Sequence, residues 1–187
     1  MGFTREQLKA FEGMTVPDLL GPEVRLLFVG INPGLWTAAT QTHFCHPSNR
    51  FYPALRKAGL IDIALDTDIG MTDAQRSEFL DRGLGITNLV PRATVRASEI
   101  AGDELRLGGQ RLLATIAAVR PVVVAVAGVT AYRTAFGQPG AELGRQELVI
   151  SGAQIWAVPN PSGLNAHETI DSLAAWFIEV GKAAGLS

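Results

Sequence analysis

The chain has 187 residues, of which 47% are apolar and 18% charged, so it is expected to fold as a soluble globular domain. Its formal net charge of −2 argues against a protein that coats nucleic acid without selectivity. The single cysteine, Cys45, excludes an internal disulfide and predicts a reducing, cytoplasmic compartment. The N-terminus lacks the apolar stretch of a signal peptide, and Arg120-Pro121 interrupts the most apolar region, so no membrane segment is expected.

The first predicted element, after an N-terminal extension of residues 1–22, is a buried strand. Residues 23–32 (EVRLLFVGIN) are largely apolar and lead into Pro-Gly, which is typical of a strand covered on both faces. Residues 49–60 (NRFYPALRKAGL) predict a helix from the spacing of their apolar residues. Residues 72–83 (TDAQRSEFLDRG) predict another, with a Thr-Asp cap and a terminal glycine. A second apolar strand follows at 84–90 (LGITNLV).

The second half of the chain continues the alternation of strands and helices. In order, the pattern predicts a helix at 102–120 with a weak Gly-Gly interior, a strand at 121–128, a short helix at 129–137, strands at 146–152 and 154–163, and a final helix at 166–185. This alternation predicts an α/β fold in which one domain, residues 23–187, has a central, mostly parallel sheet between two helical layers.

Two asparagine-containing turns follow predicted strands. The turn 32–34 (NPG) ends the first strand, and the turn 160–163 (NPSG) ends the last. Each alone is explained as a simple turn, because Asn, Pro and Gly all favour turns. Ligand sites of parallel sheets lie beyond the carboxyl ends of the strands, so the repetition favours one shared site. A third stretch, 46–51 (HPSNRF), precedes a helix, where backbone N–H groups can meet an anion.

Together these motifs resemble the mismatch-specific uracil/thymine-DNA glycosylases of the uracil-DNA glycosylase superfamily. The family's order and spacing are followed over about residues 24–180 by VGINPG, FCHPSNRFYPALRKAGL, GITNLVPRATV, LRLGGQRL and IWAVPNPSGL. The resemblance implies a uracil-DNA glycosylase-like fold and a monomer that excises uracil, or related damaged pyrimidines, from double-stranded DNA, typically opposite guanine. It implies neither a metal nor a cofactor.

The resemblance also implies roles for the residues of the two turns. Asn32 would position the water that attacks the sugar carbon, and Asn160 would lie near the scissile bond or the adjoining phosphate. An amide can hold a water but cannot take its proton at neutral pH, so we expect slow catalysis that depends on stabilising charge on the departing base. The implied substrate-binding residues are Gly30, Ile31, Pro33, Gly34, Thr37 and Phe44.

Contacts to the DNA follow from the same resemblance. Phe44 would stack on the extruded base, although a phenylalanine in an apolar neighbourhood is also explained as core. Leu164 would fill the gap left by the extruded nucleotide. Ser48 and Asn49 are candidates for phosphate contacts, or equally for helix capping. The implied DNA-binding residues are Ser48, Asn49, Pro161, Ser162, Gly163, Leu164 and Asn165.

Three features depart from the family pattern or add to it. The loop 163–167 (GLNAH) lacks the Ser and Arg that tend to follow the leucine in close bacterial relatives, so a strict preference for mismatches is in doubt. Thr37 lies near where some relatives have serine or alanine facing the C5 position of the pyrimidine, so uracil should be preferred over thymine. Asp103 begins a helix, where carboxylates usually serve the helix dipole, but it is a speculative candidate for the base that Asn32 cannot be.

Two hypotheses compete with a monofunctional glycosylase. A non-catalytic module of the same fold would bind damaged DNA or a protein partner, and the set of Asn32, Phe44 and Asn160 argues against it. A nucleotide or phosphate-ester enzyme is disfavoured because the sequence has no Walker pattern, no GxGxxG and no acidic metal cluster. None of the three lysines lies in a motif, so water is the expected nucleophile.

Overall fold

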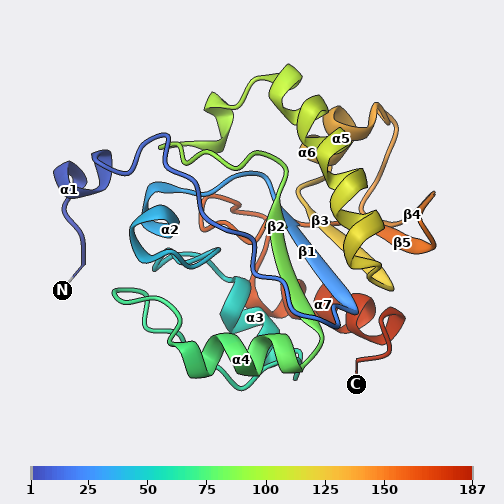
Figure 1. Cartoon of the computed structure of the whole chain (residues 1–187), viewed down its shortest axis with the longest axis horizontal. Helices are drawn as coiled ribbons and strands as arrows, with labels where there is room; N and C mark the ends of the chain where they lie inside the picture. The colour runs from blue at the N-terminus through green and yellow to red at the C-terminus, as the bar shows by residue number, and fades with distance from the viewer. Residues whose placement is uncertain (1, 187) are drawn as a thin grey trace.

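Five strands form one sheet in the computed structural model, which describes residues 2–186 (Figure 1). They are β1 (Leu26–Gly30), β2 (Leu84–Asn88), β3 (Val123–Ala127), β4 (Gly144–Ile150) and β5 (Ala153–Val158). Their spatial order is β2-β1-β3-β5-β4, and only β4, which is joined to β5 by a tight turn, runs antiparallel to its neighbour. The predicted mostly parallel α/β sheet is therefore confirmed.

Helices cover both faces of the sheet (Figure 1). One layer holds α3 (Phe51–Lys57), α4 (Asp73–Asp81) and α7 (Ile170–Ala183), and the other holds α5 (Gly102–Val119) and α6 (Val129–Phe136). The alternation of side chains along β1 explains the two layers, because Leu26 and Phe28 join one core cluster while Leu27 and Val29 join the other. The continuous apolar run of this strand reflects burial on both faces.

The parallel register brings the strand ends together. Gly30 at the end of β1 pairs with Asn88 at the end of β2, and Ala127 of β3 pairs with Val158 of β5. The turns after β1 and β5 therefore leave the sheet at the same edge, which is the edge where parallel sheets bind ligands.

The N-terminal segment lies against the rest of the chain. It includes the short helix α1 (Arg5–Lys9), which the sequence did not predict, and α2 (Leu35–Thr40) was also not predicted. Leu19 and Ile86 exchange two backbone hydrogen bonds of 2.8 and 2.9 Å, which extends the edge of the sheet beside β2. No helix within the described residues has the length and apolar character needed to cross a bilayer.

The Gly-Gly pair inside α5 allows two close backbone contacts. A Cβ atom on Gly108 would lie 2.3 Å from the carbonyl oxygen of Leu89, and one on Gly109 would lie 2.3 Å from that of Ala135. The two glycines weaken the helix by themselves, as the sequence suggested, but they let α5 pack tightly against Leu89, which follows β2, and against α6.

We expect Gly108→Ala to lower the free energy of unfolding by about 1–3 kcal/mol, because the new methyl group displaces backbone that cannot yield cheaply. Chemical denaturation measures the change. Gly140→Ala is the control, since no atom lies within 4 Å of a Cβ at that position, and its effect should stay below about 1 kcal/mol. Equal stability of the two variants would contradict the packing role assigned to Gly108.

Candidate active site

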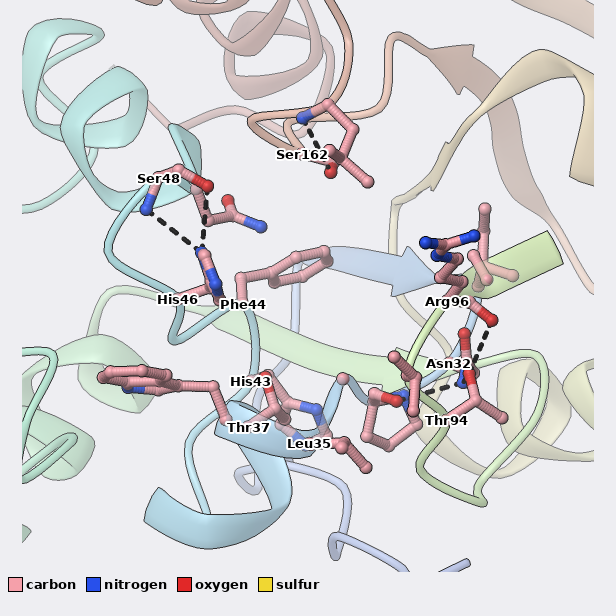
Figure 2. A pocket seen from close by; sticks show the side chains of 18 of the residues that line it. Asn32, Leu35, Thr37, His43, Phe44, His46, Ser48, Thr94, Arg96 and Ser162 are labelled. Atoms are coloured by element: carbon pink, nitrogen blue, oxygen red, sulfur yellow. Dashed lines mark hydrogen bonds between the residues drawn. The ribbon is translucent and has the colours of Figure 1, made fainter. Parts of the chain in front are cut away.

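A pocket of about 560 Å³ opens at the carboxyl edge of the sheet. The segments that line it are helix α1, the turn after β1, helix α2, residues 43–49, the ends of β2 and β3, residues 94–97 and the loop that follows β5. Figure 2 shows the ring of Phe44 reaching across this pocket, with Asn32 and Thr94 to one side and His46 and Ser48 to the other. Segments far apart in the sequence thus contribute polar side chains to one cavity.

The pocket unites most of the residues singled out from the sequence. Those that line it are Ile31, Asn32, Pro33, Gly34, Thr37, Phe44, Ser48, Asn49, Asn160, Ser162 and Leu164. Gly30, Pro161, Gly163 and Asn165 are next to lining residues in the chain but do not line the pocket themselves. The two asparagine turns therefore share one cleft.

The side chain of Asn32 is held by three acceptors. Its Nδ2 donates to the carbonyl oxygens of Pro33 (3.0 Å) and Arg92 (3.1 Å) and to Oγ1 of Thr94 (2.8 Å). Carbonyl oxygens can only accept, and the Thr94 hydroxyl already donates to the carbonyl of Arg96 (2.8 Å), so the nitrogen must face this group. The Oδ1 atom of Asn32 has no hydrogen-bond partner within residues 2–186 and is left as an acceptor.

In Asn160 the protein holds the amide oxygen rather than the amide nitrogen. Its Oδ1 accepts a hydrogen bond of 3.0 Å from the backbone N–H of Ser162, and its carbonyl oxygen accepts one of 3.0 Å from Nδ2 of Asn165. The amide nitrogen of Asn160 has no partner among the described residues and remains a donor. The pocket therefore presents a free acceptor from one asparagine turn and free donors from the other.

Phe44 packs against the core and also lines the pocket. Its ring stacks on that of Phe51, with centroids 4.2 Å apart and planes 25° apart, and it also lines the cavity. Its backbone adopts φ of +55°, which is uncommon for a non-glycine residue and turns the chain so that the ring reaches inward. Both explanations drawn from the sequence, core packing and a place in the pocket, are consistent with this geometry.

Asn88 is a pocket residue that the sequence analysis missed. Its Nδ2 lies 3.0 Å from Nδ1 of the buried His43, whose Nε2 lies 2.8 Å from the carbonyl oxygen of Pro17. Because that carbonyl can only accept, Nε2 carries the proton, so Nδ1 is an acceptor and Asn88 must turn its NH2 group toward it. A Cβ atom on Gly30 would lie 2.3 Å from Oδ1 of Asn88, so Gly30 leaves the room that this amide needs.

Burial keeps His43 in its neutral form. Desolvation lowers the pKa of His43 below its usual value, against the opposing influence of the Pro17 hydrogen bond and of Asp18. The orientation of the Asn88 amide therefore traces back to one backbone carbonyl in the N-terminal segment.

Asp103 does not line the pocket, which corrects the speculative hypothesis that it acts as a base. Its side chain is 95% exposed and pairs with Arg106 one helical turn away. Glu104 is also engaged elsewhere, because Arg92 binds both of its oxygens and holds the pKa of that carboxyl at about 2. No aspartate or glutamate is found among the described residues that line the pocket, whereas Arg5, Lys9 and Arg96 are.

The loop after β5 is braced by the turn that precedes α3. Nη1 of Arg50 donates to the carbonyl oxygens of Ser162 and Asn165, both at 3.1 Å, on either side of Leu164. Gly163 packs so closely that a Cβ there would lie 2.3 Å from Oγ of Ser48. The Leu164 side chain projects from this braced loop with 89% of its surface exposed.

Ser48 and Asn49 both form hydrogen bonds with residues close to them in the chain. Oδ1 of Asn49 accepts from the backbone N–H of Phe51 (2.9 Å), the first residue of α3, whereas the N-cap position itself is Arg50. Both the hydroxyl and the backbone N–H of Ser48 lie within 3.1 Å of Nδ1 of His46, and burial lowers the pKa of that imidazole. The N–H bond to Nδ1 leaves the proton of the neutral ring on Nε2, where it has no partner among residues 2–186.

The residues that the sequence analysis missed differ in how well the sequence pattern could have indicated them. Asn88 is the last residue of a parallel strand, so the rule that located the two turns would also have found it. Thr94 and His43 had no such signal, because their roles depend on contacts with Asn32 and Pro17 that only folding creates.

The mostly parallel sheet and this pocket define an α/β protein with a polar ligand site at its carboxyl edge. A sequence model described as the Uracil DNA glycosylase superfamily matches residues 17–180, and the chain belongs to this family. It is also similar in fold to a Methanosarcina acetivorans protein whose solution NMR structure carries the provisional name uracil DNA glycosylase. The TM-score is 0.58 at 16% identity, and the match covers 89% of this chain and 96% of that one. Membership of the superfamily supports a DNA glycosylase activity.

We expect the stability of the protein to fall as the pH drops below about 6.5, the usual pKa of histidine. The folded state holds His43 at a lower pKa, so below 6.5 the unfolded chain binds more protons than the folded one and acid favours unfolding. Denaturant unfolding at pH 7.5 and 5.5 measures the loss, which should be smaller in His43→Gln. His167→Gln, which removes an exposed histidine, is the control and should keep the wild-type loss. An equal loss in both variants would contradict this role of His43.

Proposed function

We propose that the protein is a monofunctional uracil-DNA glycosylase that acts on double-stranded DNA, preferentially on uracil opposite guanine. The single observation that carries this proposal is the pairing of a fixed acceptor, Oδ1 of Asn32, with free donors on Asn160 in one pocket beside the ring of Phe44. A water held by the acceptor and a flat pyrimidine beside the aromatic ring are the two reactants of base hydrolysis.

The base must leave the duplex before this pocket can receive it. Extrusion costs a few kcal/mol of unpairing and unstacking, and a mismatched pair costs least, which favours uracil opposite guanine. Leu164 is suited to fill the gap because the brace from Arg50 holds its loop while the side chain stays exposed. The ring of Phe44 then supplies a stacking partner, worth roughly 1–3 kcal/mol.

Recognition of the pyrimidine edge is assigned to Asn88. The hydrogen bond to His43 fixes one N–H of its amide and leaves Oδ1 and the second N–H for a ligand. Uracil presents an N3–H donor next to carbonyl acceptors, which this arrangement matches. Cytosine presents an acceptor at N3 and an amino donor beside it, so it would need the amide reversed, and the tautomer of His43 opposes that reversal.

In the proposed hydrolysis, amide side chains rather than carboxylates position the reactants. The water oxygen bonds to the anomeric carbon while the N-glycosidic bond breaks and its electron pair leaves with the base. Oδ1 of Asn32 orients the water but does not take its proton, which passes to solvent as the departing base is protonated. Donors around the base stabilise the negative charge that develops on it, and this is the main source of rate enhancement in the proposal.

The decisive experiment is single-turnover release of uracil from a G·U duplex in the presence of EDTA. Wild type should release uracil, and Asn32→Ala should be slower by on the order of 10²-fold, because the water loses its fixed position. Asn32→Asp should not recover the rate, since its carboxylate would face the three acceptors that now hold Nδ2. Asp103→Asn should keep the wild-type rate, because that residue lies outside the pocket.

Intact DNA with the wild-type protein would overturn the proposal. If the protein then still binds the duplex tightly, the non-catalytic binding module is the correct alternative. Release of uracil by Asn32→Ala at the wild-type rate would remove Asn32 from the mechanism without excluding glycosylase activity.

Thr37 is proposed to favour uracil over thymine. Its side chain is buried, with 5% exposed, and it lines the pocket, so the branched group leaves little room for a methyl at C5 of the pyrimidine. Thr37→Ala should raise excision of thymine relative to uracil by about tenfold. Parallel assays on G·T and G·U duplexes measure the ratio, and an unchanged ratio would rule out this role.

A further inference from the structure

Helix α1 presents one face to the pocket. Arg5, Leu8 and Lys9 line the cavity, and their spacing of three and four residues places them on the same side of the helix. Leu8 is half-buried, whereas the two cations are exposed. Neither Arg5 nor Lys9 forms an ion pair with any residue in the described range 2–186. The region matched to the superfamily begins only at residue 17, so this face lies outside it.

Several contacts hold α1 against the rest of the chain. Leu8 and Phe11 pack against a small core of Val16, Leu35, Ala38 and Ala93. The ring of Phe3 meets that of Trp36 edge to face, with centroids 5.1 Å apart. Just after the helix, the backbone N–H of Gly13 donates to the carbonyl oxygen of Ala93 (2.9 Å). The helix is therefore fixed beside α2 (Figure 1), and three of its residues line the pocket.

The charge around this mouth is opposite to that of the whole protein. The net charge is −2, yet the charged residues that line the pocket within the described chain are Arg5, Lys9 and Arg96. Arg96 lies three residues after Ala93, whose backbone is hydrogen-bonded to Gly13 and Met14 of the N-terminal segment. Glu99 accepts a hydrogen bond from the backbone N–H of Arg96 (2.9 Å) but does not line the pocket. The three exposed cations of the lining make a surface suited to a polyanion.

We propose that α1 is part of the DNA-binding surface and that Arg5 and Lys9 contact backbone phosphates of the strand that carries the extruded nucleotide. This inference rests on the proposed function, because it places DNA at the same pocket. On this assignment, Arg5 and Lys9 add an electrostatic contact on the rim of the pocket that also carries Arg96.

The experiment is a salt titration of binding to a duplex with one tetrahydrofuran abasic-site analogue opposite guanine, followed by fluorescence anisotropy. Each phosphate contact contributes about −0.9 to the slope of log K against log salt. The double variant Arg5→Gln/Lys9→Gln should therefore have a slope about 1.8 shallower than wild type. The affinity advantage of wild type should then shrink by about tenfold between 50 and 200 mM salt.

The control matches the change in net charge. Arg145→Gln/Lys182→Gln removes two cations that do not line the pocket, one on β4 and one on α7, and should keep the wild-type slope. Arg5→Lys/Lys9→Arg keeps both charges and should also keep it. Thermal unfolding of the first double variant should match wild type, because both of its side chains are exposed.

Equal slopes for Arg5→Gln/Lys9→Gln and its charge-matched control would overturn the proposal. This outcome is separate from a failure of the proposed function, because binding is measured without base excision. If wild type releases no uracil but Arg5→Gln/Lys9→Gln still has a shallower slope than wild type, the assignment of α1 stands.

Discussion

The backbone hydrogen bonds that pair β1 with β2 and β3, and β3 with β5, bring four strand ends to one edge of the sheet. Every part of the site depends on this parallel register. It places Asn32, Asn88 and Asn160 around one pocket although they are separated by large parts of the chain. A slip of one residue in any pairing would turn the side chains of that strand to the opposite face.

The site is built from oriented amides rather than from titrating groups. The protein holds one atom of each asparagine amide by hydrogen bonds. The nature of those partners decides whether the held atom is the nitrogen or the oxygen, and so which atom is left for a ligand. Such groups orient a water or a base edge without changing charge, which suits a reaction in which charge develops on the departing base. The neutral His43 belongs to the same scheme, since a proton on its Nδ1 would remove the acceptor that holds the amide of Asn88.

The N-terminal segment is more closely tied to the site than its position in the sequence suggests. The carbonyl of Pro17 fixes the tautomer of His43, and through it the amide of Asn88. Farther toward the N-terminus, α1 carries Arg5 and Lys9 to the mouth of the pocket. One stretch of chain thus contributes both to the interior of the pocket and to its charged rim.

The sequence by itself determined the alternation of strands and helices, the parallel sheet and the two asparagine turns, because apolar periodicity and turn residues act locally. It also pointed to Phe44 and Leu164 through a resemblance of motifs. Only the tertiary structure decided that Asp103 lies outside the pocket and that the amide nitrogen of Asn32 is held by Thr94. Such facts depend on distances between segments far apart in the chain, and no local pattern encodes those distances.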